Sequence, residues 1–439
     1  CEKMKYRYKN LIPIVLVILM AAAWYKLIDT TVNTQKQYDG YLTAARQYAK
    51  DGVIIDAITN YDNAINIKDD ISVRKEVADL YFNNNRTDEG FDYVETVLST
   101  YPKNVSAYEY AITKYKESNM YSQCFSVYSK AKNYGAVNQA IDKLMEDIQY
   151  SYKVLLTSVS EVSMYSNDMC AVRIGDYWGF VSVAGELLTD VKYAEVGDFV
   201  SDKVYVKEED GTAYFMDSAA NKRGVLPNNV VVQKVGNVQS DCYPLVSGNG
   251  CDYYNLNKTK VLGTYADATP FYNGYAVATT EKGCGLIDTK GNNIGNDNYI
   301  KTAVDERGIA TVNERVFFME GDHWLMTSLE GEKIGQDTFE EVKPFYSDNS
   351  YAAVKKDGKW GFVDKEGKVI ISPQYEEARS FSYGYAAVKK DGKWGFIDTS
   401  GKICIEPQFQ DAMDMNSKGN IFVKENDVWQ LISLYRYNY

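Results

Sequence analysis

The sequence predicts a multidomain repeat protein in which an all-α solenoid is followed by an all-β repeat domain, behind an apolar N-terminal segment. Three observations predict this class. Residues 11–25 carry no charge, small and aromatic residues recur every 33–34 residues between 38 and 137, and a Trp-Gly unit recurs at Trp360 and Trp394. Self-similarity at a fixed period marks a repeat architecture, so it bounds the fold before any local structure is assigned.

The segment 11–28 predicts one transmembrane anchor. Its uncharged run spans only ~22 Å at ~1.5 Å per residue, and the next three residues extend it. Residues 1–10 contain four basic side chains, which predicts a cytoplasmic tail and an extracytoplasmic remainder by the positive-inside rule. The alternative is a signal peptide cleaved near residues 21–23, which would release a secreted protein. Both interpretations place the bulk of the chain outside the cytoplasm.

Two further features concern the ends of this segment. The chain begins with Cys1 rather than Met, so we expect the gene product to start further upstream. The polar residues 29–37 are predicted to form a linker between the anchor and the first repeat array.

The composition argues against several classes of function. The net charge is −12 and the pI is near 4.9, so the chain lacks the basic footprint of a nucleic-acid-binding protein, and no nucleic-acid partner is expected. The single histidine, His323, argues against His-based metal sites and Ser-His-Asp catalysis. No carboxylate pair is singled out by its spacing. We therefore expect no enzymatic activity, no metal and no cofactor.

Residues 38–153 predict a helical repeat array with a capping helix at 136–153. Three units place small, apolar or aromatic residues at the same offsets: Ala45, Tyr48, Ala57, Tyr61 and Ala64; Ala78, Tyr81, Gly90, Val94 and Val97; Ile112, Tyr115, Cys124, Tyr128 and Ala131. The pattern resembles the tetratricopeptide repeat, in which small residues let two antiparallel helices approach closely. The sequence departs from that family at Tyr41, where a Trp is frequent.

This resemblance implies a concave groove that binds extended peptides. The positions facing the groove are mildly basic, which suits an acidic tail or a C-terminal carboxylate as the ligand. The alternative is a solvated helix face with no ligand. These positions are Arg46, Lys50, Lys75, Asn83 and Lys116.

Residues 154–439 predict an antiparallel β-repeat domain. In the unit 351–381 (YAAVKKDGKWGFVDKEGKVIISPQYEEARSF), an alternating strand leads into an Asp-Gly hairpin turn, a strand at Trp360, a second turn and a strand stopped by proline. Each unit is therefore a three- to four-stranded meander. A large ring that recurs at one position fills a recurring core slot, and sugar stacking is the alternative role for it.

The Trp-Gly pair sets the register of eight units, with steps of 32 to 40 residues. The motif G-K-W-G-F-[VI]-D-x-x-G-K at 358–368 and 392–402 resembles the WG-repeat (KWG) family of bacterial surface and membrane proteins. That resemblance implies a scaffold and no particular chemistry. The predicted Trp positions are Trp178, Ala213, Asp252, Cys284, Trp324, Trp360, Trp394 and Trp429, and the glycines that follow the intact tryptophans are Gly179, Gly361 and Gly395.

The two ends of the β-repeat domain predict that it closes on itself. Residues 154–172 overlay 370–388 without a gap, so the array begins with strands that precede a Trp. It ends soon after Trp429 without the strands that follow one. The first strands therefore complete the last unit, which removes the edges of an open array. We predict an eight-unit propeller-like toroid, with an open β-solenoid as the alternative.

The seven cysteines do not form a repeated framework. Cys242 and Cys251 flank a predicted hairpin and are either a disulfide pair or two buried thiols.

The leading functional prediction is a non-enzymatic, membrane-anchored extracytoplasmic scaffold whose helical and WG repeats bind a protein or a peptide. The alternative is a module that binds the cell wall or a glycan through its 38 tyrosines. The least favoured class is a propeller-type glycosidase or lyase, which requires two carboxylates in a central pocket.

Overall fold

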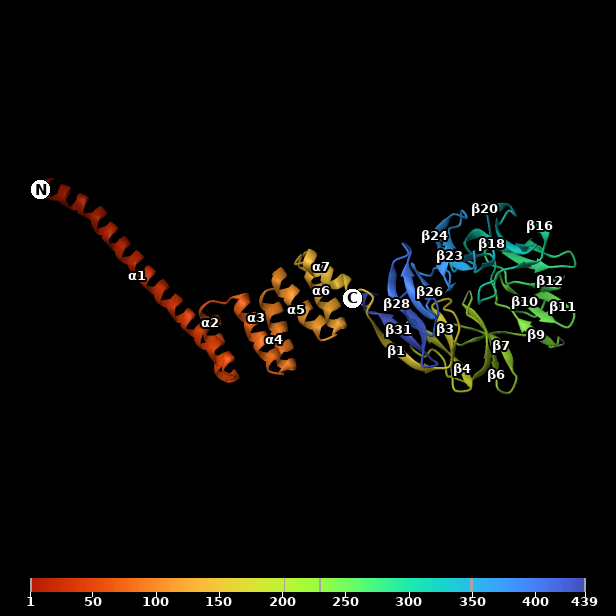
Figure 1. The fold of residues 1–439 in the computed structure, drawn as a ribbon, viewed down its shortest axis with the longest axis horizontal. Coiled ribbons are helices and arrows are strands. Elements are labelled where there is room, and N and C mark those ends of the chain that lie inside the picture. The colour runs from red at the N-terminus through yellow and green to blue at the C-terminus, as the bar shows by residue number, and fades with distance from the viewer. Residues whose placement is uncertain (1, 201, 229, 348–349, 438–439) are drawn as a thin grey trace. The chain divides into compact units, whose positions relative to one another are not determined.

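The computed structural model describes residues 2–200, 202–228, 230–347 and 350–437, with side chains from residue 16 onward (Figure 1). The chain divides into two compact units between Gln149 and Tyr150. The helical unit precedes this boundary and the β unit follows it. Cys1 and the side chains of the predicted basic tail lie outside the described residues.

A single helix, α1 (Glu2–Lys50), covers the predicted anchor, the predicted linker and the first helix of the repeat array. From residue 16 onward it is long and apolar enough to cross a membrane, with a mean hydropathy of 1.2, and the same properties fit a signal sequence. The linker expected at 29–37 is helical. Neither Gly nor Pro interrupts it, and the hydroxyls of Thr30, Thr31 and Thr34 donate to carbonyl oxygens one turn earlier.

Helical hairpins follow, and small residues lie between their helices. Ala45, Ala57 and Ala64 are fully buried, and a Cβ at Gly90 would lie 2.7 Å from the Phe82 ring. The small residues at the predicted positions therefore do lie at the contacts between paired helices. The helices after α1 are α2 (Ile54–Ile67), α3 (Ile71–Asn83), α4 (Thr87–Thr100), α5 (Val105–Glu117), α6 (Tyr121–Asn133) and α7 (Gln139–Glu146).

The capping helix is shorter than the predicted 136–153. It begins after Asn138, whose side chain accepts a hydrogen bond from the backbone N–H of Ile141 at 2.9 Å. Its C-terminal end is displaced because Tyr152 and Lys153 already belong to a β-strand that pairs with the end of the chain. The boundary between the two units consequently lies a few residues earlier than the sequence predicted.

The β unit consists of antiparallel sheets, and the succession of these sheets reproduces the predicted repeat. Most sheets have four strands, of which the first is very short. The sheets formed by consecutive strands are β9 (Val232–Val235), β10 (Cys242–Ser247), β11 (Gly250–Asn255) and β12 (Lys260–Tyr265); β13 (Asp267–Ala268), β14 (Tyr275–Thr279), β15 (Cys284–Asp288) and β16 (Asn293–Tyr299); β17 (Lys301–Thr302), β18 (Arg315–Glu320), β19 (His323–Ser328) and β20 (Lys333–Phe339); β21 (Glu341–Val342), β22 (Ala352–Lys356), β23 (Lys359–Val363) and β24 (Val369–Tyr375); and β25 (Glu377–Ala378), β26 (Tyr385–Lys390), β27 (Lys393–Asp398) and β28 (Ile403–Phe409).

One sheet has seven strands because two repeats share a strand. Its central strand, β5 (Tyr193–Val196), pairs with β4 through Trp178 and Tyr193 and with β6 on its other side. In the other repeats the strand is interrupted between these two pairings, so each pairing belongs to a separate sheet. Counted in this way, the sheets contain eight repeats. The remaining strands of this sheet are β2 (Glu161–Val162), β3 (Met169–Ile174), β4 (Tyr177–Ser182), β6 (Lys203–Glu208), β7 (Ala213–Asp217) and β8 (Lys222–Val225).

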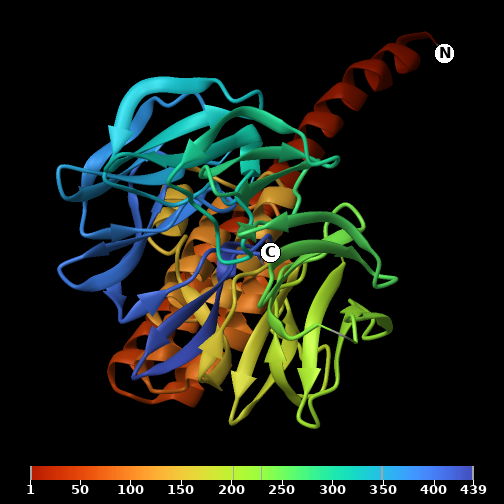
Figure 2. The ribbon, with the colours of Figure 1, turned by 90° about the vertical axis from the view of Figure 1, so that its right-hand side faces the viewer.

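The first strand of the β unit completes the last sheet, as the overlay of the two ends predicted. β1 (Tyr152–Val159) pairs with β31 (Val428–Leu434), which continues to β30 (Asn420–Glu425) and β29 (Asp411–Ala412). Figure 2 shows the sheets arranged around a common centre, with the yellow first strands beside the blue last ones. An open solenoid would leave these two strands unpaired.

The Trp-Gly motif has a steric explanation in this fold. Trp360 is buried opposite Tyr375 of the next strand, so the ring fills a core position as expected. The following residue, Gly361, faces a bulge in that strand, and a Cβ there would lie 2.6 Å from the carbonyl oxygen of Ile371. Gly395 repeats the arrangement, with the Ile405 carbonyl oxygen at 2.5 Å. The glycine lets the two backbones approach closely.

The predicted register is wrong by one residue in the third repeat. Cys251, not Asp252, pairs with the aromatic residue Tyr265, as Trp360 pairs with Tyr375. The hairpin at Ser247 to Gly250 has the same two-residue turn as the hairpin at Lys356 to Lys359, which fixes Cys251 as the equivalent of Trp360.

Cys242 and Cys251 are free, buried thiols, so the disulfide alternative is wrong. In the hairpin register Cys242 faces Asn255, whereas Cys251 faces Val246. Four residues of strand separate the two positions, which corresponds to about 13 Å and is too far for a disulfide bond.

Candidate functional site

An insertion in the fifth repeat forms a polar loop. The loop spans residues 305–308 and follows the short strand β17 (Lys301–Thr302). Asp305 organises it: the Asp305 carboxylate accepts hydrogen bonds from the Ile309 N–H at 3.0 Å and from Arg307 Nε at 2.8 Å, and the Gly308 N–H donates to the Asp305 carbonyl oxygen at 2.9 Å. The loop is therefore a closed turn with a fixed shape.

This loop contacts residues from several other repeats. Asn237 donates to the Arg307 carbonyl oxygen at 2.6 Å, and Arg307 donates to the Tyr346 carbonyl oxygen at 3.1 Å. The guanidinium of Arg379 binds Glu306 at 2.5 Å. Because these partners lie far apart in sequence, the loop joins repeats that do not follow one another in the chain.

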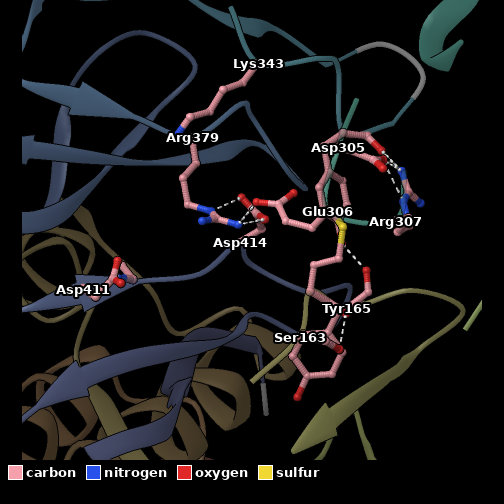
Figure 3. A network of polar contacts seen from close by, with 12 residues as sticks. Ser163, Tyr165, Asp305, Glu306, Arg307, Lys343, Arg379, Asp411 and Asp414 are labelled. Carbon is pink, nitrogen blue, oxygen red and sulfur yellow. Dashed lines mark hydrogen bonds and ion pairs between the residues drawn. The ribbon is translucent and has the colours of Figure 1, made fainter. Parts of the chain in front are cut away.

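The partners lie in corresponding segments of their repeats, a few residues after the first strand. Figure 2 shows the sheets arranged around a common centre, and Figure 3 shows side chains from several repeats gathered in one place. We call this set the central cluster: Ser163, Asp198, Asn237, Asp305, Glu306, Arg307, Lys343, Tyr346, Arg379 and Asp414.

Ion pairs dominate the central cluster. Figure 3 shows Glu306 and Asp414 both directed at the guanidinium of Arg379, whose Nε and Nη2 lie 3.1 and 3.2 Å from the Asp414 oxygens. Arg307 forms a second, forked pair with Asp305. The side chains of Asp305 and Asp414 are each only 5% exposed. Both arginine pairs are therefore largely withdrawn from water.

Burial and neighbouring charges shift the pKa values of these groups in different directions. Burial raises the pKa of Asp414 although Arg379 opposes the change. Burial likewise opposes ionisation of Glu306, but the positive charges of Arg379, Lys343 and Arg307 outweigh it and lower the Glu306 pKa. Burial and the charge of Arg379 lower the pKa of Lys343. The carboxylates of Glu306 and Asp414 are thus held by cations rather than left free.

Two cavities lie beside the loop. The larger has a volume of about 430 Å³ and the smaller about 310 Å³. Val304, Asp305 and Glu306 line both, so the loop forms part of the wall of each. Asp198 and Asn237 line the larger cavity, whereas members of the cluster from later repeats line the smaller one: Lys343, Tyr346, Arg379 and Asp414.

The basic residues predicted to line a helical groove mostly bind neighbouring repeats. Arg46 pairs with Glu76 at 2.7 Å, and Lys116 pairs with Asp147 at 2.6 Å. Lys75 donates to the Ser106 hydroxyl at 2.5 Å. These contacts connect α1, α3, α5 and the residue after α7, and they use much of the predicted positive charge within the helical unit.

The remaining two predicted groove residues have different surroundings. Lys50 is exposed in the last turn of α1, and Asn83 is exposed as the last residue of α3. The sequence reasoning missed Asp79, which accepts hydrogen bonds from Tyr110 and Lys114 at 2.8 Å each. The helical surface is consequently less basic than its lysines alone indicated.

The central cluster was not predicted at all. Its members differ from repeat to repeat, so a search for recurring residues passes over them. One signal was present: the step from Cys284 to Trp324 contains 40 residues, and the extra residues include the charged run Asp305-Glu306-Arg307.

Fold and site together define a repeat protein that joins helical hairpins to antiparallel β meanders. Residues 338–360, 360–394 and 394–429 match the family described as WG containing repeat, so this segment consists of WG repeats. No curated protein matches the chain in sequence.

The chain is similar in backbone trace to several solved structures at low sequence identity. BamB from Moraxella catarrhalis is 11% identical, with 64% of this chain and 99% of that chain covered and a TM-score of 0.44. Sqt1 of Saccharomyces cerevisiae is 11% identical, with coverage of 64% and 98% and a TM-score of 0.40. The WD40 β-propeller domain of Doa1 is 12% identical, with coverage of 65% and 97% and a TM-score of 0.32.

Proposed function

We propose that the protein is a non-enzymatic scaffold, anchored in a membrane by α1, that carries a tetratricopeptide-like array and an eight-bladed β-propeller outside the cytoplasm. The repeats would bind a protein or a peptide. The observation that carries the proposal is the pairing within the central cluster, where Arg379 binds Asp414 and Glu306 and Arg307 binds Asp305. Carboxylates committed to arginines are poor candidates for acid-base catalysis, whereas the same contacts fix the repeats against one another.

The propeller interpretation is supported by strand pairing. Because β1 pairs with β31, the array has no free end strand of the kind that an open solenoid would expose. The tetratricopeptide interpretation is supported by the buried small residues between paired helices, such as Ala57 and Gly90.

Membrane anchoring is supported by the exposed apolar surface of α1. Side chains such as Leu16, Val17 and Ile18 are more than half exposed, which is costly in water and favourable in lipid. The test is protease treatment of intact cells that express the chain with a C-terminal epitope tag, with a cytoplasmic protein as the control for lysis. Loss of the tag with an intact control supports an extracytoplasmic location, and a protected tag contradicts it.

Peptide binding by the helical unit is tested through Lys50, the exposed lysine of the predicted groove. We expect Lys50→Glu to weaken binding of acidic C-terminal peptides about 2- to 5-fold, the effect of an exposed charge contact. Lys418→Glu, an exposed lysine on the β unit, is the matched control. Equal effects of both substitutions would mean that the groove does not select these peptides.

Glycan or cell-wall binding is the second candidate, and Tyr383 is the observation in its favour. Its side chain is 54% exposed beside Tyr346, so its ring is open to stacking. Trp324, Trp360, Trp394 and Trp429 are buried, which leaves tyrosine rather than these tryptophans for the role. Retention of the protein on insoluble cell wall, and its loss in Tyr383→Ala, would favour this candidate over the peptide scaffold.

A further inference from the structure

The larger of the two cavities beside the loop has the composition of a ligand site. Its volume of about 430 Å³ lies within the ~300–1,000 Å³ range of small-molecule pockets. Its walls combine apolar with polar and charged residues, and two apolar wall residues, Ile300 and Val304, are 60% and 45% exposed, so no other part of the β unit covers them. The other apolar wall residues are Val235, Pro244, Val246, Ala268, Pro270 and Val277.

A single unsatisfied acid lies in this cavity wall. Oδ1 of Asp198 is shielded from solvent and has no hydrogen-bond partner among the described residues. A hydrogen bond from Ser163 partly satisfies this carboxylate. The remaining buried oxygen is still costly, because burial removes water without supplying a replacement partner for it. Asp198 therefore differs from Asp305, Glu306 and Asp414, which arginines already bind.

The charges around Asp198 leave it without a cation. Arg307 lies nearby but binds Asp305 and the Tyr346 carbonyl oxygen, and Lys301 lies over the ring of Trp324 at 5.2 Å. Ser163 faces Asp198 and supplies a hydroxyl rather than a charge. The other charged groups that face Asp198 or line the cavity are Asp305 and Glu306 of the loop, exposed Asp267 and exposed Lys234.

We propose that this cavity binds a primary alkylammonium group, with the ammonium paired to Asp198 and the aliphatic stem against the apolar walls. A lysine side chain of a polypeptide and a free aliphatic amine share this chemistry. Either ligand would supply the missing charge partner and cover Ile300 and Val304. The inference does not depend on the membrane anchor or on the helical unit.

Burial raises the pKa of Asp198 to about 7, so in the absence of a ligand this acid is partly protonated at neutral pH. An ammonium ligand would hold Asp198 ionised and displace its proton. Ligand affinity should therefore increase as the pH rises through about 7.

The test is calorimetric titration of the full chain in detergent with n-butylamine, in two buffers of different ionisation enthalpy at pH 7. We expect n-butylamine to bind with release of roughly half a proton. The neutral analogue n-butanol should bind about 10- to 100-fold more weakly, because it loses one hydrogen bond to a charged group. The two buffers separate the proton release from the binding enthalpy. No binding of n-butylamine overturns the proposal.

Two variants locate the site. Asp198→Asn, which keeps the size of the side chain, should weaken n-butylamine binding about 10- to 100-fold and abolish proton release. Asp267→Asn, an exposed acid in the same wall, is the control and should change affinity less than about 3-fold. Unchanged binding in Asp198→Asn, or a larger loss in Asp267→Asn, would overturn the assignment.

A final comparison distinguishes the two sources of the group. Nα-acetyl-lysine methylamide tests a side chain presented by a polypeptide, and spermidine tests a free amine. Binding of the blocked lysine supports a partner's lysine as the occupant, whereas binding of spermidine alone supports a soluble amine. A failure of the scaffold proposal would be seen in protease treatment of cells and would leave these titrations unaffected.

Discussion

Replacement of Gly361 by Ala tests the steric explanation of the Trp-Gly motif. The new Cβ would lie 2.6 Å from both the Ile371 carbonyl oxygen and the Pro373 nitrogen, whereas an ordinary contact begins near 3.4 Å. Both obstacles are backbone atoms of a paired strand, so they must retreat by several tenths of an ångström. Overpacking of this kind costs about 1–3 kcal/mol, and the fixed backbone places Gly361→Ala near the upper value.

Gly179 provides the matched control because it occupies the same motif position. A Cβ there meets Cγ2 of Val191 at 3.0 Å, a side-chain atom that can rotate away, and its nearest backbone atom, Cα of Val191, lies at 3.3 Å rather than 2.6 Å. We therefore expect Gly179→Ala to be within about 1 kcal/mol of the wild type.

Thermal unfolding followed by tryptophan fluorescence compares the two variants, since five of the six tryptophans lie in the β unit. At about 2–4 °C per kcal/mol, Gly361→Ala should lower the melting temperature by about 5–10 °C, and Gly179→Ala by far less. Equal shifts in the two variants would refute the close-approach argument.

Three further perturbations test the β unit. Arg379→Met should lower the free energy of unfolding by about 3–5 kcal/mol at pH 8, because Glu306 and Asp414 lose their cation; urea unfolding at pH 4 should show a smaller loss, since protonated acids need no counter-charge. Asp198→Asn should stabilise the chain by about 2 kcal/mol at pH 8 and should have no effect near pH 4. The pKa of Asp198 in the folded chain, about 7, lies above its value in the unfolded chain, so the Asp198 charge destabilises the fold increasingly as the pH rises from the unfolded value to 7 and fully above 7. A Gly-Ser segment in place of residues 152–159 should leave β31 with a free edge and produce oligomers in size-exclusion chromatography, whereas a monomer would argue that β1 is dispensable.

The sequence was most informative where one residue recurs with one role. Trp360 and Trp394 were correctly placed in the core because the same large ring recurs at the same position of consecutive repeats. The closure by β1 was predictable because the two ends of the array share one strand pattern. The repeat register was lost at Cys251, where no tryptophan marks the position.

The central cluster was unpredictable for the opposite reason. Asp198 and Asp414 occupy the same place in two repeats and Arg379 the preceding place in another, yet the remaining repeats carry other residues at these places. Their partnership depends on the ring bringing distant repeats together, and a comparison of repeats in sequence averages such differences away. The helical continuity of 29–37 was missed because polarity was taken as the sign of a linker, although threonine hydroxyls can continue a helix by bonding within it.

The pairing of β1 with β31 has a consequence for synthesis of the chain. Val159 emerges from the ribosome about 270 residues before its partner Trp429. At about 5–20 residues per second, β1 waits roughly 15–55 s with an unpaired edge. During that interval the growing array is an incomplete circle whose first strand is open to wrong partners, including the same strand of a neighbouring nascent chain. The arrival of β31 therefore decides whether each molecule closes on itself or joins another.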